Sequence, residues 1–300
     1  AGVLVLGPLL AMSKKAKTSL PGGCAIGSRP VDLHLFVLKK LGAKIKIKNG
    51  YIIAEAKDGL KGNNITLPKI SVGATENAIL ASFKAKGKTI IKNCAIEPEI
   101  KDLIMFLNKL GGTIKMRGRK IIVIGCKNVS KKITYKVILD RIELGTYMIA
   151  AALVGKKIKI ENIDTELVKN EIYILKKMGV LIKKQKFSVE ILKSRNIKKI
   201  NISTKPYPGF PTDLQAQLMV LMTRAHGTSK IKESIFENRF MHVPELKRMG
   251  ANIEIKNKTA IIQGPSRLTG AEVMATDLRA SVSLVLAGLV ADNRTIINRI

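Results

Sequence analysis

A glycine-rich segment near the start of the chain brings a thiol and a cation close together. Within residues 21–30, three glycines surround Cys24, and Arg29 follows five positions later, just before an expected helix. Gly22 and Gly23 permit a mobile loop, while a helix start and an arginine attract anions and lower the pKa of a thiol. The segment predicts a reactive thiol at an anion site. A buried free cysteine in an ordinary turn explains the same residues.

The remaining metal-binding and redox residue types form no recognisable pattern. Cys24, Cys94 and Cys126 contain no CxxC pair and are odd in number, and the three histidines lie far apart. We therefore expect no metal, no cofactor and no disulfide framework, and a reducing cytoplasmic location. Cys94 and Cys126 are expected to be structural.

Polar residues recur where helices are expected to begin. These positions are Thr75-Glu76, Asp140 to Glu143, Thr212 to Gln215 and Thr276 to Arg279. Helix N-caps explain Thr and Asp at such places without any function. Arg141 and Arg279 are less expected there, because a cation opposes the helix dipole unless an anion lies nearby. With Arg239, they predict a cleft that binds phosphate groups.

The elements that must position these residues follow from an internal repeat. An octet containing Leu, Lys and a central glycine recurs four times, with its glycine at Gly42, Gly111, Gly179 and Gly250. Each octet predicts the last turn of a helix, a glycine with positive φ and the first residues of a strand. A period of about 70 residues is too long for a solenoid, so each repeat should be a small layered fold.

The second repeat shows the content of one unit. Alternating and helical patterns predict strands at 65–67, 88–92, 113–116 and 120–124, and helices at 75–84 and 99–110. The fold class is therefore α/β, built from βαβαββ units. The same register predicts two domains, 1–137 with the Cys24 loop and 138–300. It also predicts that the chain begins inside one unit's first helix and stops after the second strand of a fifth, as a fragment lacking both termini.

The net charge of +31 argues less for nucleic acid than its size suggests. Lysines alternate with apolar residues, as in 44–48, which is typical of a strand with one wet face, and aromatic residues are only 4%. We expect solvated lysines and no nucleic-acid partner. The uncharged stretch 1–13 is shorter than the ~20 residues that span a bilayer, so we expect no membrane partner.

The segments with candidate chemistry resemble the UDP-N-acetylglucosamine 1-carboxyvinyltransferases, a family of enolpyruvyl transferases. The matching motifs lie in order along the whole chain, at 20–24, 29–34, 71–75, 97–99, 140–143, 210–217, 236–242 and 275–280. This resemblance implies an inside-out α/β barrel of six βαβαββ units in two domains, in agreement with the repeat.

The resemblance also implies a reaction. The family transfers the enolpyruvyl group of phosphoenolpyruvate to the 3′-hydroxyl of UDP-N-acetylglucosamine, with release of phosphate, as the first committed step of peptidoglycan synthesis. Cys24 corresponds to the loop thiol that adds to phosphoenolpyruvate or donates a proton to it, and that fosfomycin alkylates. Asp213 corresponds to the residue that takes the proton of the hydroxyl. The resemblance thus implies Cys24 and Asp213 as the catalytic residues.

The remaining implied residues bind substrate or line the cleft. The substrate-binding set is Arg29, Pro30, Val31, Asp32, Leu33, Lys69, Ile70, Ser71, Val72, Asp213, Ile235 and Arg279. Further cleft residues are His34, Glu97, Glu99, Asp140, Arg141, Phe236, Arg239 and Asp277. The implied partners are UDP-N-acetylglucosamine and phosphoenolpyruvate; the oligomeric state is left open.

This sequence departs from the family in what it lacks. The family has a Lys-Asn pair near its N-terminus and a C-terminal arginine at the active site, and neither segment is present. We therefore expect weak or no activity from this chain alone, and phosphate release at rates near those of a full-length enzyme would contradict that. The related shikimate-pathway transferase is the alternative enzyme, but it lacks the Gly-Gly-Cys loop. A non-catalytic binding relative of the same fold is the alternative from another class.

Overall fold

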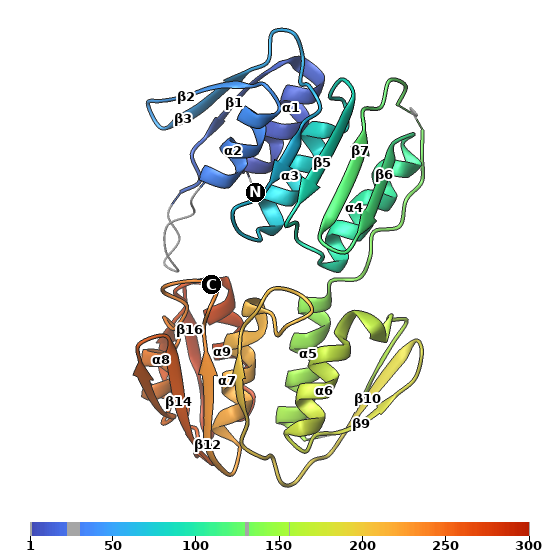
Figure 1. Cartoon of the computed structure of the whole chain (residues 1–300). Helices are drawn as coiled ribbons and strands as arrows, with labels where there is room; N and C mark the ends of the chain where they lie inside the picture. The colour runs from blue at the N-terminus through green and yellow to red at the C-terminus, as the bar shows by residue number, and fades with distance from the viewer. Residues whose placement is uncertain (1, 23–30, 130–131, 156, 300) are drawn as a thin grey trace. The chain divides into compact units, whose positions relative to one another are not determined.

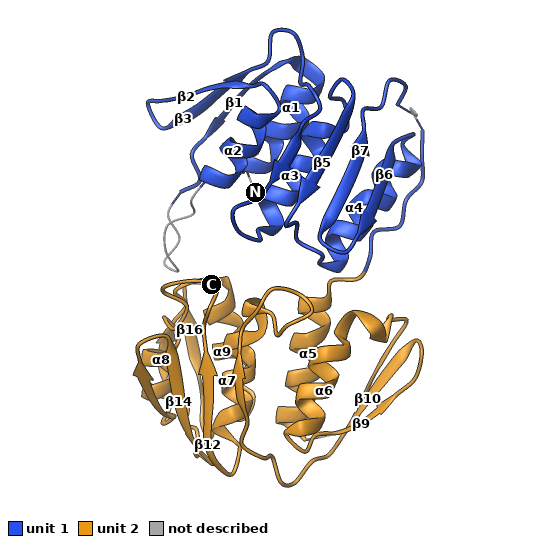
Figure 2. Ribbon diagram, in the orientation of Figure 1, with its two compact units in different colours: residues 1–23, 28–138 blue, residues 24–27, 139–300 orange. Residues whose placement is uncertain are grey.

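The computed structural model describes residues 2–22, 31–129, 132–155 and 157–299. The chain divides into two compact units, with the boundary between Ile138 and Leu139 (Figures 1 and 2). Unit 1 holds the described residues up to 138, and unit 2 holds those from 139 onward. Each unit has its own cluster of buried apolar side chains.

Unit 1 contains two repeats. The first comprises η1 (Gly2–Val5), α1 (Leu6–Ser13), β1 (Lys15–Ser19), α2 (Asp32–Lys40), β2 (Lys44–Lys48) and β3 (Tyr51–Glu55). The second comprises β4 (Asn64–Thr66), α3 (Val72–Ser82), β5 (Lys88–Lys92), α4 (Pro98–Lys109), β6 (Thr113–Arg117) and β7 (Lys120–Ile124). Its sheet has the order β4-β5-β7-β6, with β4 parallel to β5 and the other pairs antiparallel. The predicted βαβαββ unit is confirmed.

Unit 2 continues the same alternation. The third repeat of the chain, which is the first in unit 2, comprises α5 (Arg141–Val154), β8 (Ile158–Glu161), η2 (Thr165–Val168), α6 (Lys169–Lys177), β9 (Leu181–Lys184) and β10 (Ser188–Leu192). The fourth comprises β11 (Asn201–Ser203), η3 (Thr212–Leu214), α7 (Gln215–Thr223), β12 (Gly227–Lys232), α8 (Val243–Arg248), β13 (Asn252–Lys256) and β14 (Thr259–Gly264). Last come β15 (Glu272–Met274), α9 (Leu278–Gly288) and β16 (Ile296–Asn298), whose two strands pair in parallel.

The four octets end their helices in the same way. At Gly42, Gly111, Gly179 and Gly250, φ lies between 83° and 101°, as the sequence predicts. In each, the glycine N–H donates to the carbonyl three residues earlier, and the next N–H donates to the carbonyl five residues before it, as in Gly42 to Lys39 and Ala43 to Leu38. This is the Schellman motif, and it turns each helix directly into the next strand.

One helix boundary differs from the expectation and matters for the site. α3 begins at Val72 instead of near Thr75, because Ser71 is its N-cap and accepts a hydrogen bond from the Ala74 N–H at 3.3 Å. Thr75 and Glu76 therefore lie inside the helix, where the Thr75 hydroxyl donates to the Ser71 carbonyl. The cap places the 69–72 segment at the start of the most enclosed helix of unit 1.

Each unit is built around one buried helix. In unit 1, α3 packs against α1, α2 and α4, and its buried residues are mostly small. In unit 2, every residue of α7 is buried, and α7 packs against α5 and α9. Figure 1 shows the sheets on the outside of these helices. Lysines such as Lys44, Lys46 and Lys48 are exposed on strand β2, which confirms the expected wet face.

Candidate active site

Part of the predicted site lies outside the described residues. Cys24, Arg29 and Pro30 are among these positions, so their predicted roles stay predictions. Val31 is the N-cap residue of α2, and Asp32 and Leu33 form its first turn, with Leu33 buried. The other predicted residues are all described, and they fall into two groups, one in each unit.

Three aspartates that look alike in the sequence have different partners in unit 2. Asp140 caps α5 by accepting from the N–H groups of Ile142 and Glu143, at 2.7 and 3.2 Å. Asp277 caps α9 through the N–H groups of Arg279 and Ala280, at 2.8 and 3.1 Å. These two carboxylates are committed to helix ends.

Asp213 is the aspartate with a different commitment. It lies in η3 before α7, where Pro211 occupies the N-cap position. One Asp213 oxygen pairs with Arg239 Nη2 at 2.6 Å, and the other lies 3.5 Å from Arg279 Nη2. The Asp213 side chain remains 40% exposed, whereas Arg239 is 5% exposed. The structure therefore holds one accessible carboxylate between two guanidinium groups.

The two less-expected arginines find their anions within the protein. Arg279, at the start of α9, faces Asp213 as described, and Arg141, at the start of α5, lies 3.9 Å from Glu171 of α6. Arg239 also packs 5.1 Å from the ring of Phe236, at a distance suited to a cation–π contact. These carboxylates account for part of the unexpected positive charge.

Glu233 organises the backbone on both sides of Asp213, and the sequence reasoning missed it. Its carboxylate is buried and accepts from Thr212 Oγ1 through one oxygen, and from Thr204 Oγ1 and two backbone N–H groups through the other. Those N–H groups belong to Ile235 and Phe236, at 2.7 and 3.1 Å. A single glutamate after β12 thus holds the predicted substrate-binding residue Ile235 and the predicted cleft residue Phe236 close to Thr212, which precedes Asp213. A lone Glu after a strand gave no signal of this.

Two further buried side chains belong to this part of unit 2: Gln217 contacts Asp213, and His242 is influenced by Arg239 and Asp277. Gln217 Nε2 donates to the Asp213 carbonyl at 2.9 Å and lies 3.1 Å from Thr146 Oγ1, which joins α7 to α5. His242 is fully buried, and burial lowers its pKa to about 4, assisted by Arg239 and opposed by Asp277. Its neutral ring adds no further positive charge near Arg239.

In unit 1, the predicted binding residues gather at the start of α3. Ser71 caps the helix, Val72 is its first residue and is 37% exposed, and Lys69 is exposed just before it. The first N–H groups of a helix lack acceptors within the helix and favour anions. The buried ring of His34, from α2, lies against the same turn.

Glu97 and Glu99, also predicted near the cleft, influence a third carboxyl group. The pKa of Glu76 is raised, first by burial and then by the negative charges of Glu99 and Glu97. Three acidic groups thus lie near one another beside α3 and the start of α4. Among the described residues, no group of His, Cys, Asp and Glu side chains has a geometry that holds a metal ion.

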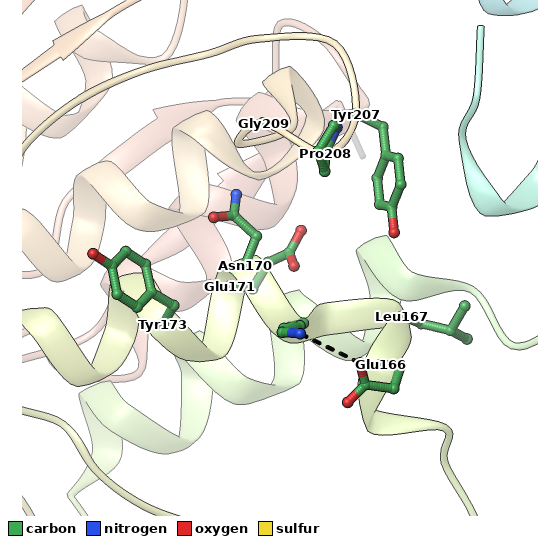
Figure 3. A pocket seen from close by; sticks show the side chains of 9 residues that line it. Glu166, Leu167, Asn170, Glu171, Tyr173, Tyr207, Pro208 and Gly209 are labelled. Atoms are coloured by element: carbon green, nitrogen blue, oxygen red, sulfur yellow. Dashed lines mark ion pairs between the residues drawn. The ribbon is translucent and has the colours of Figure 1, made fainter. Parts of the chain in front are cut away.

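Unit 2 also contains a pocket of about 500 Å³ between α6 and the loop before Phe210. Figure 3 shows Asn170 and Glu171 of α6 facing the loop that carries Tyr207 and Pro208. Arg141 lies 5.7 Å from the ring of Tyr207, so it supports this wall. The remaining lining residues are Glu166, Leu167, Lys169, Tyr173 and Gly209. Within the described part of the chain, no helix is both long and apolar enough to cross a membrane.

Comparison with known proteins identifies the chain as a carboxyvinyl transferase. The family profile described as EPSP synthase (3-phosphoshikimate 1-carboxyvinyltransferase) matches residues 1–300, and the chain belongs to this family. A solved neighbour, the enolpyruvyl transferase NikO from Streptomyces tendae, superimposes with a TM-score of 0.86 at 22% identity, covering 98% of this chain and 71% of that one. This likeness supports the α/β fold.

Within the family, similar proteins carry one particular name. A UDP-N-acetylglucosamine 1-carboxyvinyltransferase from Pelagibacter ubique (strain HTCC1062) is 58% identical over 300 residues, which are 100% of this chain and 72% of that protein. UDP-N-acetylglucosamine 1-carboxyvinyltransferase 1 from Caldanaerobacter subterraneus subsp. tengcongensis is 53% identical with the same coverage. These relatives favour the nucleotide-sugar enzyme over the shikimate-pathway alternative.

Proposed function

We propose that this protein transfers the enolpyruvyl group of phosphoenolpyruvate to the 3′-hydroxyl of UDP-N-acetylglucosamine and releases phosphate. The reaction is the first committed step of peptidoglycan synthesis, in the cytoplasm. Relatives above 50% identity across the whole chain support this assignment. The structural observation that carries it is Asp213, an accessible carboxylate held between Arg239 and Arg279 and free of helix capping.

The chemistry follows from a base and a set of cations. Asp213 removes the proton of the 3′-hydroxyl while the hydroxyl oxygen attacks C2 of phosphoenolpyruvate. At the same time C3 receives a proton, for which Cys24 is the proposed donor. A tetrahedral intermediate forms. Loss of a proton from C3 then expels phosphate and leaves the enolpyruvyl ether. Arg279 and Arg29 are proposed to meet the anionic groups of phosphoenolpyruvate, where fixed cations stabilise the developing charge.

The nucleotide sugar is proposed to bind the two predicted segments that begin α2 and α3 in unit 1, and the family resemblance implies Ile235 as a further substrate-binding residue. Val31, Asp32 and Leu33 begin α2, and Lys69 to Val72 lead into the α3 N-terminus, which is suited to a diphosphate. Phe236, fixed by Glu233, lies beside Ile235.

The test measures phosphate release with protein in excess over substrate, so that a slow first turnover registers. Phosphoenolpyruvate is combined either with UDP-N-acetylglucosamine or with shikimate 3-phosphate. We expect release only with the nucleotide sugar. Release only with shikimate 3-phosphate would establish the alternative enzyme, and release with neither, without saturable UDP-N-acetylglucosamine binding, would favour the non-catalytic relative.

Asp213→Asn tests the base. We expect the rate of phosphate release to fall at least ~100-fold, because amides cannot accept the proton. Asp292→Asn is the matched control: Asp292 pairs with Arg267 at 2.6 Å and is 50% exposed, so it repeats the ion pair on the surface of the same unit. An unchanged rate in Asp213→Asn would exclude Asp213 as the base.

A further inference from the structure

Asn77 is a buried residue of α3 whose amide is oriented by the backbone. Its Oδ1 accepts a hydrogen bond from the Gly7 N–H at 2.8 Å, and its Nδ2 donates to the Val3 carbonyl at 3.0 Å. A flipped amide would place a donor against the Gly7 N–H and an acceptor against the Val3 carbonyl. Both bonds would be lost, so the amide orientation is fixed.

The second Nδ2 hydrogen sets the protonation of His34. Asn77 Nδ2 lies 3.1 Å from His34 Nδ1, and an amide NH₂ can only donate. Nδ1 must therefore carry a lone pair, and the neutral ring carries its proton on Nε2. Burial lowers the pKa of His34, with Asp32 opposing, which also favours the neutral form. α3, which packs against α2, contains Glu76 as its only ionisable residue, and η1 and α1, which pack against α3, contain none.

The protonated edge of the ring faces the first turn of α3. A Cβ added at Gly73 would lie 3.0 Å from His34 Cε1 and 3.2 Å from Nε2. The His34 residue is 9% exposed, and Nε2 has no hydrogen-bond partner among the described residues. His242 Nε2 is fully enclosed and has no hydrogen-bond partner, whereas His34 Nε2 is not fully enclosed. The His34 donor therefore reaches the surface beside Gly73.

Several donors at this turn have no acceptor among the described residues. The first backbone hydrogen bond of α3 runs from the Thr75 N–H to the Ser71 carbonyl, and the Ala74 N–H donates to Ser71 Oγ. The N–H groups of Val72 and Gly73 come before these and have no acceptor within the helix. The Nε2–H of His34 is the third. Three N–H donors at the same helical turn suit an anionic oxygen, and a neutral imidazole adds a donor without another charge.

We propose that His34 donates from Nε2 to a diphosphate oxygen of the bound nucleotide, and that Asn77 is the positioning residue that holds His34 in the required tautomer. This proposal rests on the proposed function for its ligand. The Asn77–His34 hydrogen bond selects which ring nitrogen faces the ligand. If Nδ1 carried the proton instead, Nε2 would present a lone pair to an anion.

Long-range ¹H–¹⁵N NMR of the free protein tests the tautomer without any ligand. The expected spectrum shows His34 protonated at Nε2 and not at Nδ1. In Asn77→Asp, the carboxylate accepts from Nδ1–H, so we expect the proton to move to Nδ1 at high pH and the ring to become doubly protonated at lower pH. A wild-type ring protonated at Nδ1 would overturn the proposal.

Calorimetric titration with UDP tests the consequence for binding. We expect His34→Ala to weaken affinity about 10-fold, the size of one hydrogen bond to a charged group, and His34→Gln to recover part of it through its amide N–H. Asn77→Asp should bind about 10-fold more weakly at pH 8 and regain affinity at lower pH, when both ring nitrogens carry protons. A purely structural role for Asn77 predicts no such regain.

Asn108→Asp is the matched control. Asn108 of α4 also bridges backbone groups in unit 1, donating to the Ile114 carbonyl at 2.9 Å and accepting from the Ile114 N–H at 2.8 Å, without contacting a histidine. We expect a similar loss of thermal stability and unchanged UDP affinity. If wild type binds UDP and His34→Ala binds equally well, this proposal fails while the proposed function stands. If the wild-type protein does not bind UDP, a nucleotide diphosphate is excluded as the ligand. The NMR experiment then still tests whether Asn77 sets the tautomer of His34.

Discussion

At the scale of single residues, the two described thiols lie in surroundings that suppress reactivity. Cys94 is fully buried, its S–H donates to the Ile91 carbonyl, and burial raises its pKa to about 11. Cys126 is buried and donates to the carbonyls of Gly111 and Asn128. The thiolate is the reactive form, so the raised pKa makes Cys94 a poor target for alkylation, and burial limits access to the Cys126 sulfur in the folded protein.

These surroundings make the chain its own control for the proposed Cys24 thiol. We expect fosfomycin to label Cys24 and to leave Cys94 and Cys126 unmodified, as read by mass spectrometry of the peptides. Cys24→Ala should abolish labelling of the folded protein. Labelling that persists in Cys24→Ala, or that appears equally at all three cysteines, would contradict a specifically activated thiol.

Residue types predicted much of the candidate site, but not which residue serves which purpose. Asp140, Asp213 and Asp277 each precede a helix, and the sequence favours capping for all three. Only tertiary contacts separate them, because the partner of Asp213 is Arg239, 26 positions further along the chain. Glu233 and Asn77 escaped prediction for the same reason: their functions consist of hydrogen bonds to distant backbone groups.

At the scale of elements, the repeat predicted helix ends better than helix starts. A Schellman end depends on local residues, above all a glycine at positive φ, so four octets were sufficient. The start of α3 depends on a choice between caps, Ser71 or Thr75, and the structure selects Ser71. The Thr75 hydroxyl is then free to accept from the Ala95 N–H, a contact no local pattern reveals.

Gly42 and Gly111 separate the two costs of placing a side chain at such an end. Both have φ near 100°, but nothing lies within 4 Å of a Cβ at Gly42, whereas a Cβ at Gly111 would lie 2.9 Å from the Asn128 carbonyl oxygen. We expect Gly42→Ala to cost about 1–2 kcal/mol from backbone strain alone. Gly111→Ala should cost at least ~1 kcal/mol more, because that carbonyl must move.

Urea unfolding of the two variants and wild type measures this difference within one unit. The two glycines share a motif, so the comparison cancels the effect of Ala on the unfolded chain. Equal losses would show that the Asn128 loop yields without cost. A larger loss at Gly42 would contradict the contact-based explanation.

At the scale of the whole molecule, each unit encloses polar side chains within its apolar core. α3 buries Asn77, and α7 buries Gln215 and Gln217 along with its apolar residues. The sequence predicted helices and strands from periodicity, but a helix buried on every side has little amphipathic pattern to indicate its neighbours. The buried histidines belong to the same class of feature, one in each unit: His34 and His242.

Buried neutral histidines make stability fall in mild acid. The pKa of His242 is about 4 in the folded protein and about 6.5 when unfolded, because burial disfavours the imidazolium. Between these values the unfolded chain binds more protons, so lowering the pH through this window favours unfolding. The full shift corresponds to about 3 kcal/mol, present above pH 6.5 and lost by pH 4. The lowered pKa of His34 acts in the same direction in unit 1.

His242→Gln should remove most of the acid-induced loss of unfolding free energy that arises in unit 2. A glutamine does not titrate, so we expect a smaller loss of unfolding free energy between pH 7.5 and pH 5 than in wild type, whatever its stability at pH 7.5. His226→Gln is the matched control, since it makes the same replacement at an exposed position of the same unit. Urea unfolding at both pH values gives the comparison. If His242→Gln keeps the full wild-type slope, the acid sensitivity comes from other groups, such as His34 or carboxylates, and the His242 ring is not the group that must charge on unfolding.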